Sequence, residues 1–210
     1  MKSTRNILAI FLVVLAFAGG TFFMIQSMQS GRAQPAFATV WPSPKPLAEF
    51  SLVDHSGTEF TKNRLAGQWS LMFFGFTHCP DICPISLQTL ADMQNAIDDT
   101  DVSHAIKIYF VSVDPERDTP EVLAEYVKYF SPAFSGATAP LEALTPLTRS
   151  LGIAHAIRNR TETSADYDVE HSAAIVLINP QAEYAGLFSA PHDPLAMARD
   201  MTRIVERHPL

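Results

Sequence analysis

The stretch of sequence that decides the fold is FFGFTHCPDICP, residues 73–84. It holds the only two cysteines of the 210-residue chain, Cys79 and Cys83. The apolar run 71–74 predicts a buried strand, and the periodic segment 84–97 predicts a helix whose apolar face includes Ile85 and Leu87. Because residues four apart on a helix are neighbours, two thiols at this strand-to-helix turn can project from one surface.

Strands and helices alternate on either side of this turn. A few core strands with helices between them predict an α/β sandwich. Pro146 should kink or restart the helix that contains it. In chain order, the expected elements are a hairpin (50–61), a central strand (69–76), the helix after Cys83, a second central strand (105–113), helices (120–130 and 140–152), a short strand (153–159), a third core strand (173–179), a strand (184–188) and a last helix (194–208).

The charge balance excludes one class of partner. The formal net charge is −7, and Lys2 and Arg5 are the only charged residues among the first 25. The remainder therefore holds 13 basic and 22 acidic side chains, a net charge of −9. An acidic domain without a basic stripe is unsuited to follow phosphate backbones, so we expect no nucleic-acid binding.

The N-terminus predicts a membrane anchor. Residues 7–25 are 19 residues without a charge, and as a helix they would be about 28 Å long, close to the ~30 Å hydrocarbon core of a bilayer. Lys2 and Arg5 favour a cytoplasmic N-terminus and an exported remainder. A cleaved signal, with a cleavage site near residues 36–38, and a buried core helix are the alternatives, but cleaved signals have shorter apolar cores of about 7–15 residues.

These features divide the chain into three parts. Residues 1–25 are expected to form a single-pass anchor. Residues 26–46 are polar and punctuated by prolines, which predicts a tether. Residues 47–210 are expected to form the folded domain.

Residue chemistry alone leaves three interpretations of Cys79 and Cys83 open. An exported chain with an even cysteine count often uses a structural disulfide, but closing a loop of about five residues stabilises the fold by only about 2 kcal/mol. A thiol at the start of a helix has its thiolate favoured, which suits a redox pair. Thiolates are also soft ligands for Cu(I) or Zn(II), so a metal-binding pair is the third interpretation.

A third metal ligand has to come from the seven histidines of the chain. His171 follows a polar loop and stands at the edge of the third core strand, from where a side chain can lean over a site. On spacing alone, an ordinary partly buried histidine is the alternative. The other six are His55 in a turn, His78 beside Cys79, His104 and His208 in polar or terminal stretches, and His155 and His192, which the sequence leaves unassigned.

Three blocks of the chain resemble the signature blocks of the Sco/SenC family. They are FFGFTHCPDICP (73–84), VSVDPERDTP (111–120) and YDVEHS (167–172). The family comprises membrane-anchored, thioredoxin-fold copper proteins that assist assembly of the dinuclear copper centre of cytochrome c oxidase. The resemblance covers about residues 46–207 and implies a thioredoxin-like sandwich. Residues 135–139 and Val176 depart from the family pattern, and both lie away from the cysteines in sequence.

Specific residues follow from this resemblance. It implies copper ligands at Cys79, Cys83 and His171, and the same two cysteines form the family's dithiol/disulfide pair. Asp114 matches an acidic position near the site, with a loop cap as its alternative role. Phe76 and Tyr167 are candidates for an exposed docking surface, and core packing is their alternative.

The resemblance also implies a function and a location. We expect a copper metallochaperone in a bacterial inner membrane, with its C-terminal domain in the periplasm. Its expected partners are the copper-bearing subunit of cytochrome c oxidase and other periplasmic copper carriers or thiol reductants. The alternative is a thiol–disulfide reductase that maintains the cysteines of the oxidase copper site, which needs Cys79 and Cys83 but not His171. A thiol peroxidase is disfavoured, because the sequence has no distant resolving cysteine.

Overall fold

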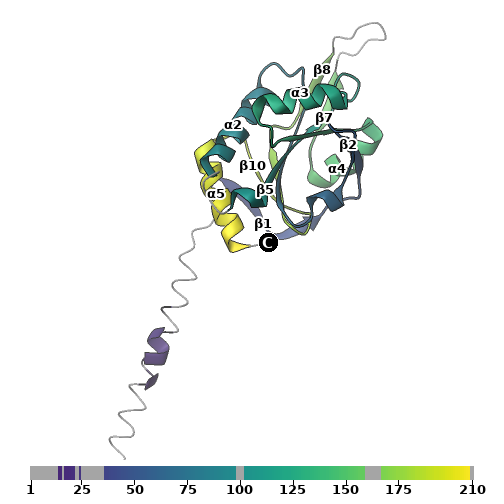
Figure 1. The fold of residues 1–210 in the computed structure, drawn as a ribbon. Coiled ribbons are helices and arrows are strands. Elements are labelled where there is room, and N and C mark those ends of the chain that lie inside the picture. Colours follow the sequence, from purple (N-terminus) through teal and green to yellow (C-terminus); the bar gives the residue numbers. More distant parts are fainter. Residues whose placement is uncertain are drawn as a thin grey trace, which may run out of the picture. The chain divides into compact units, whose positions relative to one another are not determined.

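The computed structural model describes residues 14–15, 17–21, 24, 36–97, 102–158 and 167–208 (Figure 1). The chain divides into two compact units, residues 1–34 and 35–210. The described residues before position 25 are helical, but across the described ranges no helix is both long and apolar enough to cross a bilayer. Most of the expected anchor (1–25) lies outside the described residues, so the anchor stays a prediction.

An eight-stranded sheet forms the centre of the second unit, with the strand order β1-β10-β9-β4-β5-β6-β2-β3. β4, β5 and β6 run parallel, whereas all other neighbours are antiparallel. The predicted hairpin and the three core strands are confirmed. The strands are β1 (Ala38–Pro46), β2 (Ser51–Asp54), β3 (Glu59–Thr61), β4 (Trp69–Gly75), β5 (Ile106–Ser112), β6 (Ser135–Thr138), β9 (Ile175–Ile178) and β10 (Glu183–Phe188).

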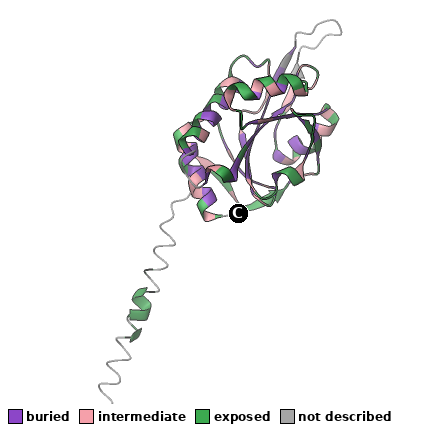
Figure 2. Cartoon of the chain, in the orientation of Figure 1, coloured by how far each residue is buried: buried purple, intermediate pink, exposed green. Residues whose placement is uncertain are grey.

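β4 forms the middle of the core. It lies between β5 and β9, and all of its residues are buried because both faces of the sheet are covered. The parallel connections from β4 to β5 and from β5 to β6 run in the same direction across the sheet, so the usual right-handed crossover places α2 (Ile82–Ile97) and α3 (Pro120–Phe130) on one face. α5 (Pro194–Arg207) packs against α2. α4 (Leu141–Leu151) contacts β2 and lies apart from these three helices (Figure 1). Buried residues line the inward sides of the helices, and exposed residues line the outward sides (Figure 2).

Local sequence explains where the helices begin and end. The side chains of Thr119 and Asp193 accept backbone N–H groups in the first turns of α3 and α5. Gly152 ends α4 with a φ of 68°, a left-handed conformation that favours glycine. Pro146 lies inside α4, which continues past it, so the expected restart of the helix is not seen. The helices are α2 (Ile82–Ile97), α3 (Pro120–Phe130), α4 (Leu141–Leu151) and α5 (Pro194–Arg207), with short 3-10 turns at Lys62–Leu65 and Ser103–Ala105.

The N-terminal boundary of the domain differs from the prediction. Residues 38–46, expected within the tether, form β1 and pair with β10. β1 is an edge strand, where prolines are tolerated because one side of the backbone has no ladder partner. The buried carboxylate of Asp200 on α5 also accepts the N–H groups of residues 36–38, at 2.7–3.1 Å. The domain therefore begins before residue 47, and residues 26–35 of the expected tether lie outside the described residues.

A second, two-stranded sheet is formed by β7 (His155–Arg158) and β8 (Asp168–His171). The two strands are antiparallel, and their register places His155 opposite His171. A polar loop was expected over residues 160–168, and its residues 160–166 lie outside the described residues. β8 ends at His171, four residues before β9 begins in the main sheet.

Candidate metal centre

The two cysteines lie where β4 passes into α2. β4 ends at Gly75, and the cysteine loop (residues 76–81) leads into the first turn of α2. Cys79 lies in this loop with 9% of its surface exposed, and Cys83 lies in α2 with none exposed. The backbone N–H of Cys83 donates to Sγ of Cys79 at 3.4 Å. Both cysteines are free thiols, and only Cys79 is open to an approaching molecule.

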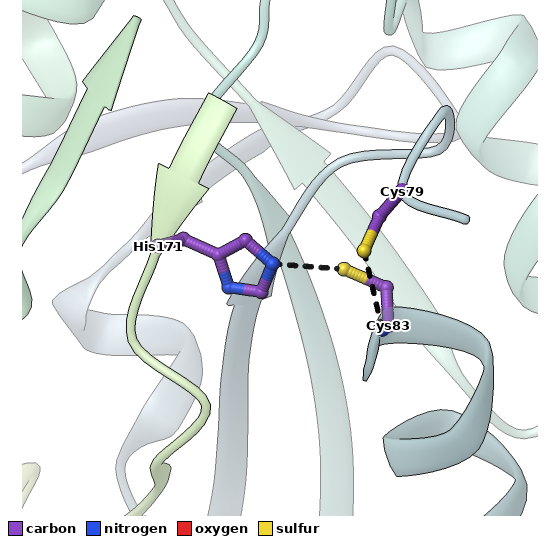
Figure 3. A group of neighbouring side chains, drawn as sticks. All are labelled: Cys79, Cys83 and His171. Atoms are coloured by element: carbon purple, nitrogen blue, oxygen red, sulfur yellow. Dashed lines mark hydrogen bonds between the residues drawn. The ribbon is translucent and has the colours of Figure 1, made fainter. Parts of the chain in front are cut away.

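His171 reaches the same point from β8. Its Nε2 atom lies 3.2 Å from Sγ of Cys83, and its ring points toward the two sulfurs (Figure 3). Its Nδ1 atom lies 3.1 Å from the carbonyl oxygen of Ser172. A carbonyl only accepts, so the ring proton belongs on Nδ1 and the lone pair of Nε2 faces the sulfurs. The rings of Phe73 and Phe76 pack edge-on against the imidazole at 5.8 and 5.7 Å.

The three side chains form one group that can hold a metal ion. Sγ of Cys79, Sγ of Cys83 and Nε2 of His171 lie within 4.8 Å of one another, and in the part of the chain that the structure describes this is the one such group of three or more. Burial lowers the pKa of His171, which favours the neutral imidazole that a metal needs. Two sulfurs and one imidazole form a soft, three-ligand site that suits copper better than zinc, which prefers four ligands.

Burial also affects Cys83. It raises the pKa of Cys83 above the ordinary thiol value, and the neighbouring Cys79 adds to the effect. The buried thiol therefore keeps its proton until an opposite charge, such as a metal cation, enters the site. Cys79 and His171 line an open pocket together with Phe76, Arg117, Tyr167 and Val169.

Asp114 does not join the group of potential ligands. It is fully buried and receives bonds from Nε of Arg117 and the hydroxyl of Tyr167. Arg117 and Asp118, which the sequence analysis did not single out, lie in the same turn. Phe76 and Tyr167 are 6% and 9% exposed, so core packing, not an exposed docking surface, is confirmed for both.

The remaining histidines lie outside the group. His78 is next to Cys79 in sequence, but its side chain is 56% exposed and faces Asp118 at 4.0 Å. His155 lies beside His171 across the β7–β8 pair. His55 bonds to the backbone of Gly136, and His208 packs against Trp69.

The chain is similar in sequence to proteins of known families. Residues 34–206 match the model of the SCO1/SenC family. The chain is 34% identical over 205 residues to protein SCO2 homolog, mitochondrial, of Bos taurus, which covers 97% of this chain and 75% of the bovine protein. It is 38% identical over 146 residues to protein SCO1 homolog, mitochondrial, of Homo sapiens, which covers 69% of this chain and about half (48%) of the human protein.

A solved structure resembles the fold as well. The crystal structure of Arabidopsis thaliana ScoI with copper bound matches with a TM-score of 0.69 and 33% identity, over 75% of this chain and 97% of that one. This match confirms the expected thioredoxin-like α/β sandwich.

Proposed function

Because this chain belongs to the SCO1/SenC family, we propose that it is a copper metallochaperone that uses Cys79, Cys83 and His171 as ligands. The observation that carries the proposal is that two sulfurs and one imidazole nitrogen, from segments 88 residues apart, lie within 4.8 Å of one another. The copper bound in the Arabidopsis relative supports the choice of ion. Copper is the cargo here, and it is held as Cu(I) or Cu(II).

The arrangement suits uptake and release of a soft cation. Two thiolates and a neutral imidazole carry a charge of −2, which attracts the cation and holds it by soft donors. Loading requires both cysteines to be reduced and deprotonated, so oxidation to a disulfide prevents loading. Because Cys79 lies at the pocket and Cys83 is buried, a partner's thiolate would displace Cys79 first. Ligand exchange then proceeds one donor at a time.

The partner and location are also part of the proposal. We assign the chain to a bacterial inner membrane, anchored by residues 7–25, with the domain in the periplasm. Its recipient is the copper-bearing subunit of cytochrome c oxidase, the partner that membership of the SCO1/SenC family implies. Periplasmic copper carriers and thiol reductants would load and reduce it.

Copper stoichiometry tests the proposal. The reduced full-length protein in detergent should bind one copper per chain, and Cys83→Ser and His171→Ala should bind with affinities at least about 10-fold lower. His78→Ala is the matched control, because His78 is adjacent to Cys79 but outside the ligand group, and it should bind as the wild type does. Equal binding by wild type, Cys83→Ser and His171→Ala would rule the site out.

A second function is favoured by the unequal exposure of the two thiols. In a thiol–disulfide reductase, the Cys79 thiolate would attack a substrate disulfide and form a mixed disulfide, releasing one substrate thiol. Cys83 would then displace the second thiol, leaving a Cys79–Cys83 disulfide and a substrate reduced by two electrons. This reaction does not use His171, so reductase activity that survives His171→Ala but is lost in both cysteine variants would favour it.

A further inference from the structure

The strand that carries His171 needs anchors beyond its own hairpin. β7 and β8 form a sheet of only two strands, and isolated two-stranded hairpins are marginally stable in water. A metal ligand, however, has to be held within about 0.5 Å of its working position. Contacts outside the β7–β8 pair must therefore fix the histidine arm, residues 167–171, in front of the sulfurs.

Tyr167, at the start of the histidine arm, is docked onto the turn after β5. Its hydroxyl donates to the buried carboxylate of Asp114. Burial and this bond raise the pKa of Tyr167 to about 12, so the phenol stays a donor at neutral pH. The guanidinium of Arg117 lies 3.8 Å over the Tyr167 ring and donates from Nη1 to the Tyr167 carbonyl at 3.3 Å. Nε of Arg117 donates to the carboxylate of Asp114. Asp114, Arg117 and Tyr167 are therefore each hydrogen-bonded to the other two.

The same turn also holds the cysteine loop. The N–H of Asp118 donates to the carbonyl of Asp114 at 3.0 Å, which fixes the two acids in one turn. The carboxylate of Asp118 accepts the N–H of Thr77 at 2.9 Å and its hydroxyl at 2.5 Å. Arg117 lies over the ring of Phe76 at 5.7 Å. Arg117 therefore contacts both the cysteine loop and the histidine arm.

We propose that Arg117 is a positioning residue, which holds the histidine arm against the cysteine loop so that the site offers three ligands instead of two. A guanidinium can bond a carboxylate, bond a carbonyl and stack on a ring at the same time, and an ammonium group cannot. The side chain is 17% exposed, which shields these contacts from water. The proposal rests on the proposed copper function only for its metal readout.

The primary test is Arg117→Lys. This substitution keeps a positive charge beside Asp114, but it removes the planar guanidinium that bonds two groups at once and stacks on the Tyr167 ring. In the copper-free protein, nuclear Overhauser contacts between the His171 ring and the rings of Phe73 and Phe76 should be lost. With Cu(II), the nitrogen coupling in the electron paramagnetic resonance spectrum should disappear. Copper affinity should fall about 10–100-fold, the range seen when groups that orient metal ligands are removed.

A double variant separates positioning from general destabilisation. If Arg117 acts through His171, adding Arg117→Lys to His171→Ala should lower copper affinity no further. Arg64→Lys is the matched control, because Arg64 pairs with the buried Asp54 at 3.2 Å elsewhere in the fold. It should leave the ring contacts and the copper spectrum unchanged. Arg117→Met repeats the test with the charge removed.

Two results would overturn the proposal. One is a His171 ring that keeps its contacts with Phe73 and Phe76 in Arg117→Lys. The other is a double variant whose losses of copper affinity add. If the wild type binds no copper, the proposed function fails, and the ring contacts in the copper-free protein decide the role of Arg117 by themselves.

Discussion

The sulfur of Cys83 packs against the bare Cα of Gly75. A Cβ atom on residue 75 would lie 2.6 Å from Sγ of Cys83 and 2.9 Å from the ring of Phe110. The ring belongs to the neighbouring strand β5 and is fully buried, so it has little room to move aside. β4 therefore ends on glycine because the site needs the space that any side chain would occupy.

Gly75→Ala should damage both the metal site and the fold. The added methyl group has to displace Sγ of Cys83, Phe110 or β4, and overpacking of this kind destabilises by about 1–3 kcal/mol. Copper affinity should fall by at least about 10-fold, because ligand geometry shifts as well. Chemical denaturation and copper titration measure the two effects.

Gly136→Ala is the control for Gly75→Ala. Its Cβ would meet Cβ of Leu123 at 3.0 Å, a tight contact in the core away from the cysteines. It should lower stability without changing copper affinity. Equal effects of the two substitutions on copper binding would show that Gly75 has no special relation to Cys83.

The two thiols should react with alkylating agents at different rates. Cys79 is 9% exposed at an open pocket, and Cys83 is fully buried with a pKa raised by burial. Because the exposed thiolate is the reactive form, iodoacetamide should modify Cys79 at least about 10-fold faster than Cys83. Mass spectrometry of the reduced, metal-free protein at successive times gives both rates. Cys79→Ser should then be nearly unreactive, and Cys83→Ser should react as fast as the wild type; the reverse order would contradict the assigned exposures.

Local patterns were sufficient to predict the centre of the fold. The apolar run before Cys79 and the periodic segment after Cys83 carry their own signals, and β4 and α2 form there. The apolar face of α2 was less well predicted, because Leu87 is buried as expected but Ile85 is 55% exposed. Helix periodicity does not show where neighbouring elements end, and Ile85 lines an open groove between α2 and α3.

Long-range contacts account for what the sequence analysis missed. The prolines of residues 38–46 are typical of a tether, and only pairing with β10, some 140 residues away, makes this segment a strand. Spacing alone did not decide whether His171 is a metal ligand or an ordinary buried histidine, and only the family resemblance implied a ligand. The role of Arg117 depends on Tyr167, 50 residues away, so no local pattern indicates it.

The carboxylate of Asp200 should hold the N-terminal strand to the domain. It is 2% exposed and accepts three backbone N–H groups from residues 36–38. Asp200→Ala leaves these donors without their partner, which should destabilise the fold by about 1–3 kcal/mol. Hydrogen exchange in β1 and proteolytic cleavage near residue 38 should both become faster.

Asp193→Ala is the control for Asp200→Ala. It removes the N-terminal cap of the same helix, α5, and should also destabilise by about 1 kcal/mol. It leaves the contacts of residues 36–38 intact, so exchange in β1 should change only as much as global stability does. A selective loss of protection in β1 in both variants would argue against the proposed role of Asp200.

Stability should fall in acid partly because of Asp54. Burial alone raises its pKa, but bonds from Ser56 and Thr58 and the nearby Arg64 outweigh burial and hold the pKa below its ordinary value. A carboxyl group with a lowered pKa in the folded state stabilises the protein above the pKa of the unfolded chain, about 3.9, and loses this contribution as pH falls through the folded-state pKa.

Asp54→Asn isolates this contribution. The variant should be less stable than the wild type by about 1–3 kcal/mol at pH 7, since charge-assisted bonds are lost. The difference should stay constant down to about pH 5 and shrink below about pH 4, because the wild-type carboxylate is then protonated. Urea unfolding of both proteins between pH 3 and 7 measures this difference in stability. A difference that grows as the pH falls would mean that the folded-state pKa of Asp54 is raised, and the bonds from Ser56 and Thr58 would then be weaker than the geometry indicates.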